Sequence, residues 1–231
     1  MDFVRTKAFT TFARAINPII IDMKHFILTL LAACSIAVCA QKNQDMSKYL
    51  AGAVPVKEGM VVFDKTYEVP DKSKGEIYSL LKNYTERAII KGELSLTQSR
   101  MQETDSIQGL IVAAVEEYLY FKRSPLSTDG TRMYYQLIYR VEEGKFNVEM
   151  RRIRYIYDIT DTPSTEANPD LCFSAEDWIT DKEALNRKQT KLLKMPGKFR
   201  RFTIDRKNQI FSEAAIATGA VRKVKMVEVY E

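Results

Sequence analysis

Apolar and polar side chains alternate along the middle of the chain, in three segments rich in β-branched and aromatic residues. The segments cover residues 109–122, 131–142 and 145–158. Successive side chains of a strand point to opposite faces, so this pattern predicts three antiparallel strands that share one apolar face. Asp129-Gly130 and Glu143-Gly144 supply turn residues between them. We therefore expect a sheet that helices cover on one side.

The alternation slips by one residue within the third segment. The apolar positions are Phe146, Val148 and Met150 before the slip, and Ile153, Tyr155 and Tyr157 after it. One extra residue flips the alternation, so a β-bulge near Arg151-Arg152 would restore a common buried face. The alternative is that the strand changes its neighbours at this point.

Helix signals flank the three strands. Ser73 and Glu76 have the spacing of a capping box, and the helix that follows is expected to end at Gly92. A second capping box is expected at Thr180 and Glu183, and a last helix over residues 198–217 that ends at Gly219. Two further strands are expected over residues 60–69 and 94–101. The order predicts an α+β fold, with a curved, mostly antiparallel five-stranded sheet and helices packed on one face.

The amino-terminal region predicts export. Residues 26–38 form a short apolar run behind Met23-Lys24-His25, and Ala40-Gln41 follows it, which is typical of a secretory signal peptide cleaved after Ala40. The run is too short for a transmembrane helix. A rival site is the lipobox-like sequence that ends at Cys34, where acylation would anchor the protein to a membrane.

The predicted organisation has four parts. Residues 1–40 are an extension and signal peptide with Met23 as the expected true start, 41–58 a linker, 59–219 a single domain, and 220–231 a charged tail. Removal of residues 1–40 lowers the formal net charge from +5 to +3 and removes His25, the single histidine. Such a weak charge gives no reason to expect nucleic acid as a partner. Cys172 is then the remaining cysteine, and burial is the expected state of its thiol.

Two parts of the sequence resemble a known family. They are the opening that contains Val54-Pro55-Val56, Gly59 and Val61-Val62-Phe63, and the carboxyl-terminal pattern Trp178-Ile179-Thr180-Asp181 with Gly197-Lys198-Phe199-Arg200-Arg201-Phe202-Thr203-Ile204-Asp205. The resemblance is to a family of exported proteins of Gram-negative bacteria, a domain of unknown function with a TATA-box-binding-protein-like (TBP-like) fold. It implies a five-stranded curved sheet with helices on one face and a place in the periplasm or cell envelope. It implies no catalytic residues, and the name of the fold gives no reason to expect DNA binding.

The residues of the expected mature chain exclude several kinds of chemistry. Without histidine there is no nucleophilic triad, and one cysteine cannot build a structural zinc site. No glycine-rich phosphate loop is present, so we expect no cofactor. Glu116-Glu117 could act as paired carboxylates, but an exposed glutamate paired with Arg140 or Arg152 is the more ordinary interpretation.

The expected strands also carry tyrosines and arginines that could face a ligand or a partner. The residues of this face are Tyr134, Tyr135, Tyr139, Arg151, Arg152 and Tyr155. Such tyrosines are more often core residues with their hydroxyls at the rim, and arginines on strands more often pair with acidic neighbours. Both interpretations stay open.

Three functions remain. The first is a non-enzymatic envelope protein whose uncovered sheet face binds an envelope protein or a glycan. The second is a carrier that holds an apolar small molecule between sheet and helices, in a cavity lined by Leu137, Phe146 and Met150. The third is a hydrolase that uses Glu116 or Glu117. The sequence favours the first.

Overall fold

The computed structural model describes residues 46–124, 127–156 and 172–221. Met23, Cys34, Ala40, Gln41 and residues 222–231 of the charged tail lie outside these ranges, so the predictions on export and processing stay predictions. The compact unit considered below begins at Lys48. It includes part of the segment that was expected to be a linker, because Tyr49 and Val54 are buried in its core.

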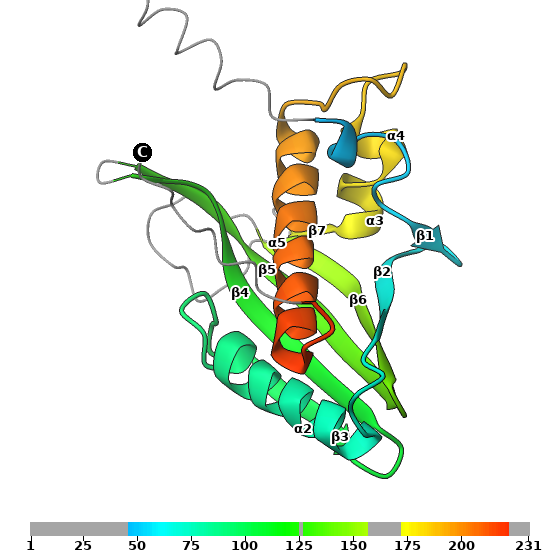
Figure 1. Ribbon diagram of the computed structural model, residues 1–231. Coiled ribbons are helices and arrows are strands. Elements are labelled where there is room, and N and C mark those ends of the chain that lie inside the picture. The colour runs from blue at the N-terminus through cyan, green and yellow to red at the C-terminus, as the bar shows by residue number, and fades with distance from the viewer. Residues whose placement is uncertain (1–45, 125–126, 157–171, 222–231) are drawn as a thin grey trace, which may run out of the picture. The chain divides into compact units, whose positions relative to one another are not determined.

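Within the described residues, seven antiparallel strands form the sheet, in the order β1-β2-β6-β5-β4-β3 with β7 also paired to β6 (Figure 1). Their bounds are β1 Val56–Lys57, β2 Met60–Glu68, β3 Arg100–Asp105, β4 Leu110–Ser124, β5 Ser127–Glu142, β6 Lys145–Ile156 and β7 Cys172–Ser174. The predicted class, α+β with an antiparallel sheet, is confirmed. The strand count of five was too low, because the short strands β1 and β7 carry no alternation that a sequence pattern could show.

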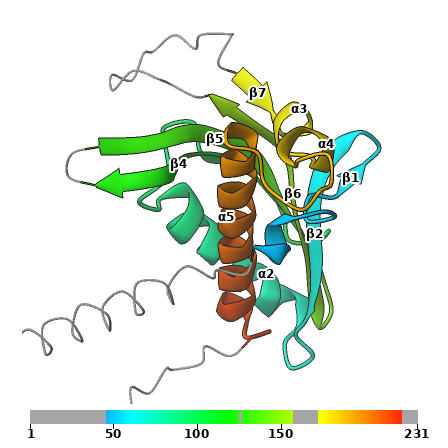
Figure 2. The same ribbon diagram turned by 90° about the horizontal axis from the view of Figure 1, so that it is seen from above.

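Two long helices, α2 (Lys74–Tyr84) and α5 (Met195–Thr218), pack on the same side of the sheet, and the sheet curves around α5 (Figure 2). The shorter elements are η1 (Ser47–Tyr49), η2 (Thr85–Ile90), α3 (Ala175–Trp178) and α4 (Asp181–Ala184). The side of the sheet that faces α2 and α5 is called the covered face below. On β5 it carries Met133, Tyr135, Leu137, Tyr139 and Val141, all buried.

The capping signals explain where the long helices begin and end. The Ser73 hydroxyl accepts a hydrogen bond from the Glu76 backbone N–H, and the Glu76 carboxylate accepts one from the Ser73 backbone N–H, so the predicted capping box starts α2. Gly219 ends α5 with φ +82°, as predicted for a left-handed cap. Gly92 differs. It follows η2 and has no positive φ. Glycine is needed there because the backbone leaves no room for a side chain: a Cβ would lie 2.1 Å from the Ala88 carbonyl oxygen.

The bulge predicted in the third segment is present. Arg152 has φ +53°, and the β5–β6 register shifts between Tyr134 and Gln136, opposite Arg152. On its other edge β6 also changes its neighbour. It pairs with β2 as far as Arg151, and with β7 from Arg154 onward. The two interpretations of the slip are therefore both realised at the same place.

Three local predictions were wrong. Residues 94–99 form turns with one isolated bridge from Ser95 to Glu117, and the strand starts only at Arg100, because Ser99 and Gln98 bond to Glu116 instead of continuing the ladder. Thr180 starts α4 without a side-chain cap, since its hydroxyl donates to the Glu176 carbonyl. Cys172 is exposed, because the short edge strand β7 leaves its side chain uncovered.

Candidate functional site

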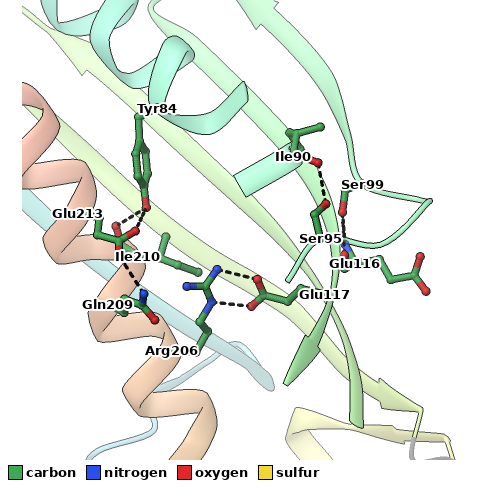
Figure 3. Close-up of polar contacts among 10 residues, drawn as sticks. All are labelled: Tyr84, Ile90, Ser95, Ser99, Glu116, Glu117, Arg206, Gln209, Ile210 and Glu213. Atoms are coloured by element: carbon green, nitrogen blue, oxygen red, sulfur yellow. Dashed lines mark hydrogen bonds and ion pairs between the residues drawn. The ribbon is translucent and has the colours of Figure 1, made fainter. Parts of the chain in front are cut away.

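The adjacent residues Glu116 and Glu117 of β4 point to opposite faces of the sheet (Figure 3). Alternation along a strand requires this. The Glu117 carboxylate lies on the covered face against α5, and the Glu116 carboxylate lies on the opposite side, called the open face below. The two carboxylates therefore cannot act on one substrate as a pair.

Glu117 is held by Arg206 of α5 inside the sheet–helix interface. The guanidinium donates from Nε to Oε1 at 2.9 Å and from Nη2 to Oε2 at 2.8 Å, and both side chains are buried. Burial lowers the pKa of Arg206, but the hydrogen bonds and charge of Glu117 outweigh this and raise it overall. An ion pair with this geometry is a structural connection between β4 and α5 rather than a free acid or base.

A second polar contact lies next to this pair and joins the two long helices. Tyr84, at the end of α2, donates its hydroxyl to Glu213 of α5 at 3.0 Å, and Gln209 donates to the same carboxylate at 2.9 Å (Figure 3). Burial, first of all, raises the pKa of Tyr84 far above its usual value. These polar groups of the covered face thus hold β4, α2 and α5 together.

The open face is organised by Glu116 and Tyr134, which lie opposite each other on β4 and β5. The Tyr134 hydroxyl donates to Glu116 Oε1 at 2.5 Å, and the backbone N–H of Gln98 donates to Oε2 at 3.1 Å. Burial and the hydrogen bond to Glu116 raise the pKa of Tyr134 to about 12. Both oxygens of Glu116 therefore have donors within the protein.

A pocket of about 310 Å³ opens beside this pair. Its lining comes from residues 98–102, from β4 and β5, and from β6 next to the bulge. The lining residues are Gln98, Arg100, Gln102, Ala114, Val115, Glu116, Tyr134, Tyr135, Gln136, Arg152 and Arg154. The Arg154 guanidinium lies 4.6 Å from the centre of the Tyr134 ring. With three arginines and one carboxylate, the lining is positively charged.

Beyond the pocket, the open face carries polar side chains that form hydrogen bonds and ion pairs with one another. Arg140 donates to Glu149 at 2.9 Å, and Arg151 donates to Gln136 at 3.0 Å and pairs with Glu149 at 3.3 Å. The expected pairing of Glu116 or Glu117 with Arg140 or Arg152 was therefore wrong. Glu149 of β6 is instead the acidic partner of Arg140 and Arg151.

The structure divides the six residues that were expected to face a ligand. Tyr135, Tyr139 and Tyr155 lie buried on the covered face, where the Tyr155 hydroxyl bonds to Thr203 of α5 at 2.8 Å. Tyr134 and Arg152 line the open-face pocket, as Tyr135 also does although its side chain is buried, and Arg151 donates to the lining residue Gln136. Sequence reasoning missed Gln98, Arg100 and Gln102 as pocket residues, because residues 94–101 were expected to be ordinary strand.

Two further features are absent from the described residues. Within residues 46–124, 127–156 and 172–221, no cluster of His, Cys, Asp or Glu side chains could hold a metal ion. In the same ranges, no helix has both the length and the apolar character needed to cross a bilayer.

Comparison with solved structures decides the family. A crystal structure of a DUF4468 family protein from Bacteroides ovatus is 34% identical to this chain, with a TM-score of 0.68, and the match covers 79% of this chain and 99% of that one. The chain belongs to the DUF4468 family. This family is a domain of unknown function with a TBP-like fold, and its sequence pattern matches residues 63–156, from β2 to the end of β6.

A second crystal structure supports the fold. A TBP-like protein from Parabacteroides distasonis is 21% identical, with a TM-score of 0.57, over 72% of this chain and 97% of that one. An aromatase/cyclase from a Streptomyces species, at 12% identity and a TM-score of 0.26, is too distant to inform either fold or function. A comparison with curated proteins found no match. The resemblance to a TBP-like domain of unknown function is thus confirmed.

Proposed function

We propose that this DUF4468 protein is exported to the cell envelope and acts there as a non-enzymatic binding module, whose open-face pocket binds a glycan that carries acidic groups. The observation that carries the proposal is the charge of the pocket. Glu116 is already bonded by Tyr134 and Gln98, whereas Arg100, Arg152 and Arg154 form no ion pair with any described residue. Arginine binds carboxylate and sulfate groups through two parallel hydrogen bonds.

The rest of the lining suits a sugar chain. Gln98, Gln102 and Gln136 bring amides to the lining. Gln136 already donates to Gln102 and accepts from Arg151, and the remaining amide hydrogens and lone pairs can bond to hydroxyl groups. The exposed large apolar residues among those described are Met46, Val56, Ile107, Leu193, Met195 and Val221, and none of them lines this pocket. Protein interfaces usually have an apolar centre, so a polar ligand is favoured over a protein partner.

Catalysis by carboxylates has less support. Glu116 and Glu117 face opposite sides of the sheet, and Glu117 is bonded by Arg206 through both oxygens. General acid–base catalysis on a glycosidic bond uses two carboxylates that flank it on the same side of the protein. The geometry therefore favours a binding role.

The cavity expected for an apolar carrier also has little support. Leu137, Phe146 and Met150, which were expected to line it, are fully buried core residues, and none of them lines the open-face pocket. Phe146 packs on Tyr67 and Tyr139.

A glycan array tests the proposal. It should include neutral chains and chains that bear carboxylate or sulfate groups, and it should compare the wild type with the double variant Arg152→Gln/Arg154→Gln. We expect binding to acidic chains, weakened at least about tenfold in the double variant because two charge-assisted bonds are lost. Arg187→Gln, which removes an exposed arginine outside the pocket, is the matched control and should bind as the wild type does.

Thermal unfolding of the variants shows whether they are folded. Binding that does not distinguish acidic from neutral chains, or that survives in the double variant, would contradict the proposal. Capture of a protein from the envelope through Arg152 and Arg154, with no glycan bound, would replace the glycan by a protein partner.

A further inference from the structure

β2 carries a lysine at a position where a core residue is expected. Val61, Phe63, Lys65 and Tyr67 alternate on the side of β2 that faces the helices, and Val61 and Phe63 are buried. Lys65 thus stands between two aromatic residues on the covered face, but near the end of the strand where its own side chain is exposed. Its ammonium group lies 4.7 Å from the centre of the Tyr67 ring.

α5 carries a second lysine in a core-facing row. Lys207 comes four residues after Thr203 and four before Phe211, which are both buried, and residues four apart lie on one side of a helix. Its ammonium group lies 5.1 Å from the centre of the Phe63 ring and 5.7 Å from that of Phe211. The two lysines therefore lie over different rings, Lys65 over that of Tyr67 and Lys207 over those of Phe63 and Phe211.

These side chains border a pocket of about 290 Å³ between β2 and α5. Its lining residues are Ala53, Pro55, Phe63, Asp64, Lys65, Tyr67, Lys207, Asn208, Phe211, Ser212 and Val221. Three aromatic rings supply an apolar lining, and the two ammonium groups supply positive charge. The pocket is separate from the one on the open face and shares no residue with it.

The positive charge of this pocket is not neutralised by the protein. Asp64, the only carboxylate among the lining residues, pairs with Lys57 at 2.7 Å. Lys207 donates to the neutral Asn208 side chain at 2.6 Å, and neither Lys65 nor Lys207 forms an ion pair with a described residue. Burial, and after it the charge of Lys65, lowers the pKa of Lys207.

The partly buried Lys207 reduces stability, because its charge is partly desolvated and the exposed Lys65 repels it. Positions where a sequence breaks its own pattern without an internal partner are typical of functional sites. An anion between the two ammonium groups would supply the missing charge. The aromatic rings would cover an apolar body attached to that anion.

We infer that this pocket binds a small organic anion, with its carboxylate held by Lys65 and Lys207 and its flat or aliphatic body packed against Phe63, Tyr67 and Phe211. The three aromatic rings and two ammonium groups of its lining favour a small anion with an apolar body over a peptide or a sugar chain. The site lies between sheet and helix, as a carrier would require, but at a different place from the core residues Leu137, Phe146 and Met150.

Calorimetric titration with two anions and one neutral analogue tests the inference. The probes are 4-phenylbutyrate, octanoate and the uncharged 4-phenylbutyramide, added to the purified protein. We expect at least one anion to bind, and phenylbutyramide to bind more than tenfold more weakly than phenylbutyrate. Lys207→Met and Lys65→Met, which keep the apolar stem and remove the charge, should each weaken anion binding by about tenfold.

Two controls separate binding from folding and from the open-face site. Lys188→Met removes an exposed lysine outside the pocket and should leave the affinity unchanged, as should Arg152→Gln/Arg154→Gln. Lys207→Met should also raise the melting temperature of the free protein, since it removes a desolvated charge.

Equal binding of phenylbutyrate and phenylbutyramide would overturn the inference. So would the failure of both anions to bind the wild type at millimolar concentration, or unchanged binding in both lysine variants. Failure of the glycan experiment alone would leave this site unaffected.

Discussion

Arg206 of α5 and Glu117 of β4, 89 residues apart in the chain, join through two parallel hydrogen bonds of 2.9 and 2.8 Å. The pair lies where α5 crosses the sheet, and both side chains are buried. Around it, Tyr84 and Glu213 connect α2 to α5. The sheet and its two long helices are therefore fixed to one another by charged and polar contacts as well as by apolar packing.

Breaking this pair on one side should be costly. Glu117→Gln leaves the Arg206 charge buried without a counter-charge, so we expect a loss of about 3 kcal/mol in the free energy of unfolding, measured by urea denaturation. Glu117→Leu combined with Arg206→Met removes both charges and should cost much less than the single change. The exposed pair Arg123–Glu93 is the control, and Glu93→Ala should change stability by less than about 0.5 kcal/mol. A double variant less stable than Glu117→Gln would contradict this account.

Arg200 connects α5 to the amino-terminal segment and to α4. It is fully buried and donates to the carbonyls of Tyr49, Leu50 and Ile179 and to the Asp181 carboxylate. A lysine cannot reproduce this planar set of donors, so we expect Arg200→Lys to cost about 3 kcal/mol in urea denaturation. Arg187→Lys, at an exposed position, should have no effect. Equal stability of the two variants would show that the bonds of Arg200 are replaceable.

Sequence patterns predicted the features that depend on neighbouring residues. The capping box of Ser73 and Glu76, the bulge at Arg152 and the end of α5 at Gly219 each follow from a spacing or a residue type within a few positions. Period-two alternation likewise identified β4, β5 and β6. These features are local and could be found from the sequence alone, although the equally local capping box expected at Thr180 and Glu183 is not formed.

The contacts that build the site depend on partners far along the chain. Glu117 at a core-facing strand position indicates a buried positive partner, but nothing local selects Arg206 from the other basic residues. The partners that were expected, Arg140 and Arg152, lie on strands β5 and β6. Arg140 bonds to Glu149, and Arg152 lines the open-face pocket. The lysine at position 65 is a visible break in the alternation of β2, and it was a signal that could have located the second pocket.

Gly92 and Gly219 follow helices but should respond differently to substitution. At Gly92 a Cβ would lie 2.1 Å from the Ala88 carbonyl oxygen, which is backbone and cannot move aside, so we expect Gly92→Ala to cost about 3 kcal/mol. At Gly219 the nearest atom is the flexible Lys72 ammonium at 3.3 Å, and only the positive φ is unfavourable, so Gly219→Ala should cost about 1 kcal/mol. Urea denaturation of both variants measures the difference. A larger loss at Gly219 would contradict it.

Ionisation of the buried tyrosine hydroxyls should lower the stability of the fold at high pH. Burial and the bond to Glu116 raise the pKa of Tyr134 to about 12 from the ordinary 10.0. Burial first of all also raises the pKa of Tyr135, Tyr139 and Tyr155. A group whose pKa is higher in the folded state stabilises it fully below its unfolded pKa, and this stabilisation is lost as the pH rises through the folded value. We therefore expect the melting temperature to fall between about pH 10 and pH 12.

The same titration can be followed by the ultraviolet absorbance of tyrosinate. Folded protein should show a group of tyrosines that ionise only as the protein unfolds. Tyr134→Phe removes one of them and also the hydrogen bond to Glu116. Ionisation of all tyrosines near pH 10 with the fold intact would contradict the predicted shifts.

Export predicts a defined amino terminus for the mature protein. Cleavage after Ala40 would leave Gln41 as the first residue, whereas processing at the lipobox-like sequence would leave an acylated Cys34. Native mass spectrometry of the protein extracted from the envelope fraction distinguishes the two by mass, and we expect the unmodified chain from Gln41. Cys34→Ser should leave that mass unchanged, because the residue is removed with the signal peptide. Ala40→Arg should block cleavage, since the signal peptidase requires a small residue there. A lipid-modified mass that Cys34→Ser abolishes would instead show a membrane-anchored protein, and its binding pockets would then be held close to the membrane surface.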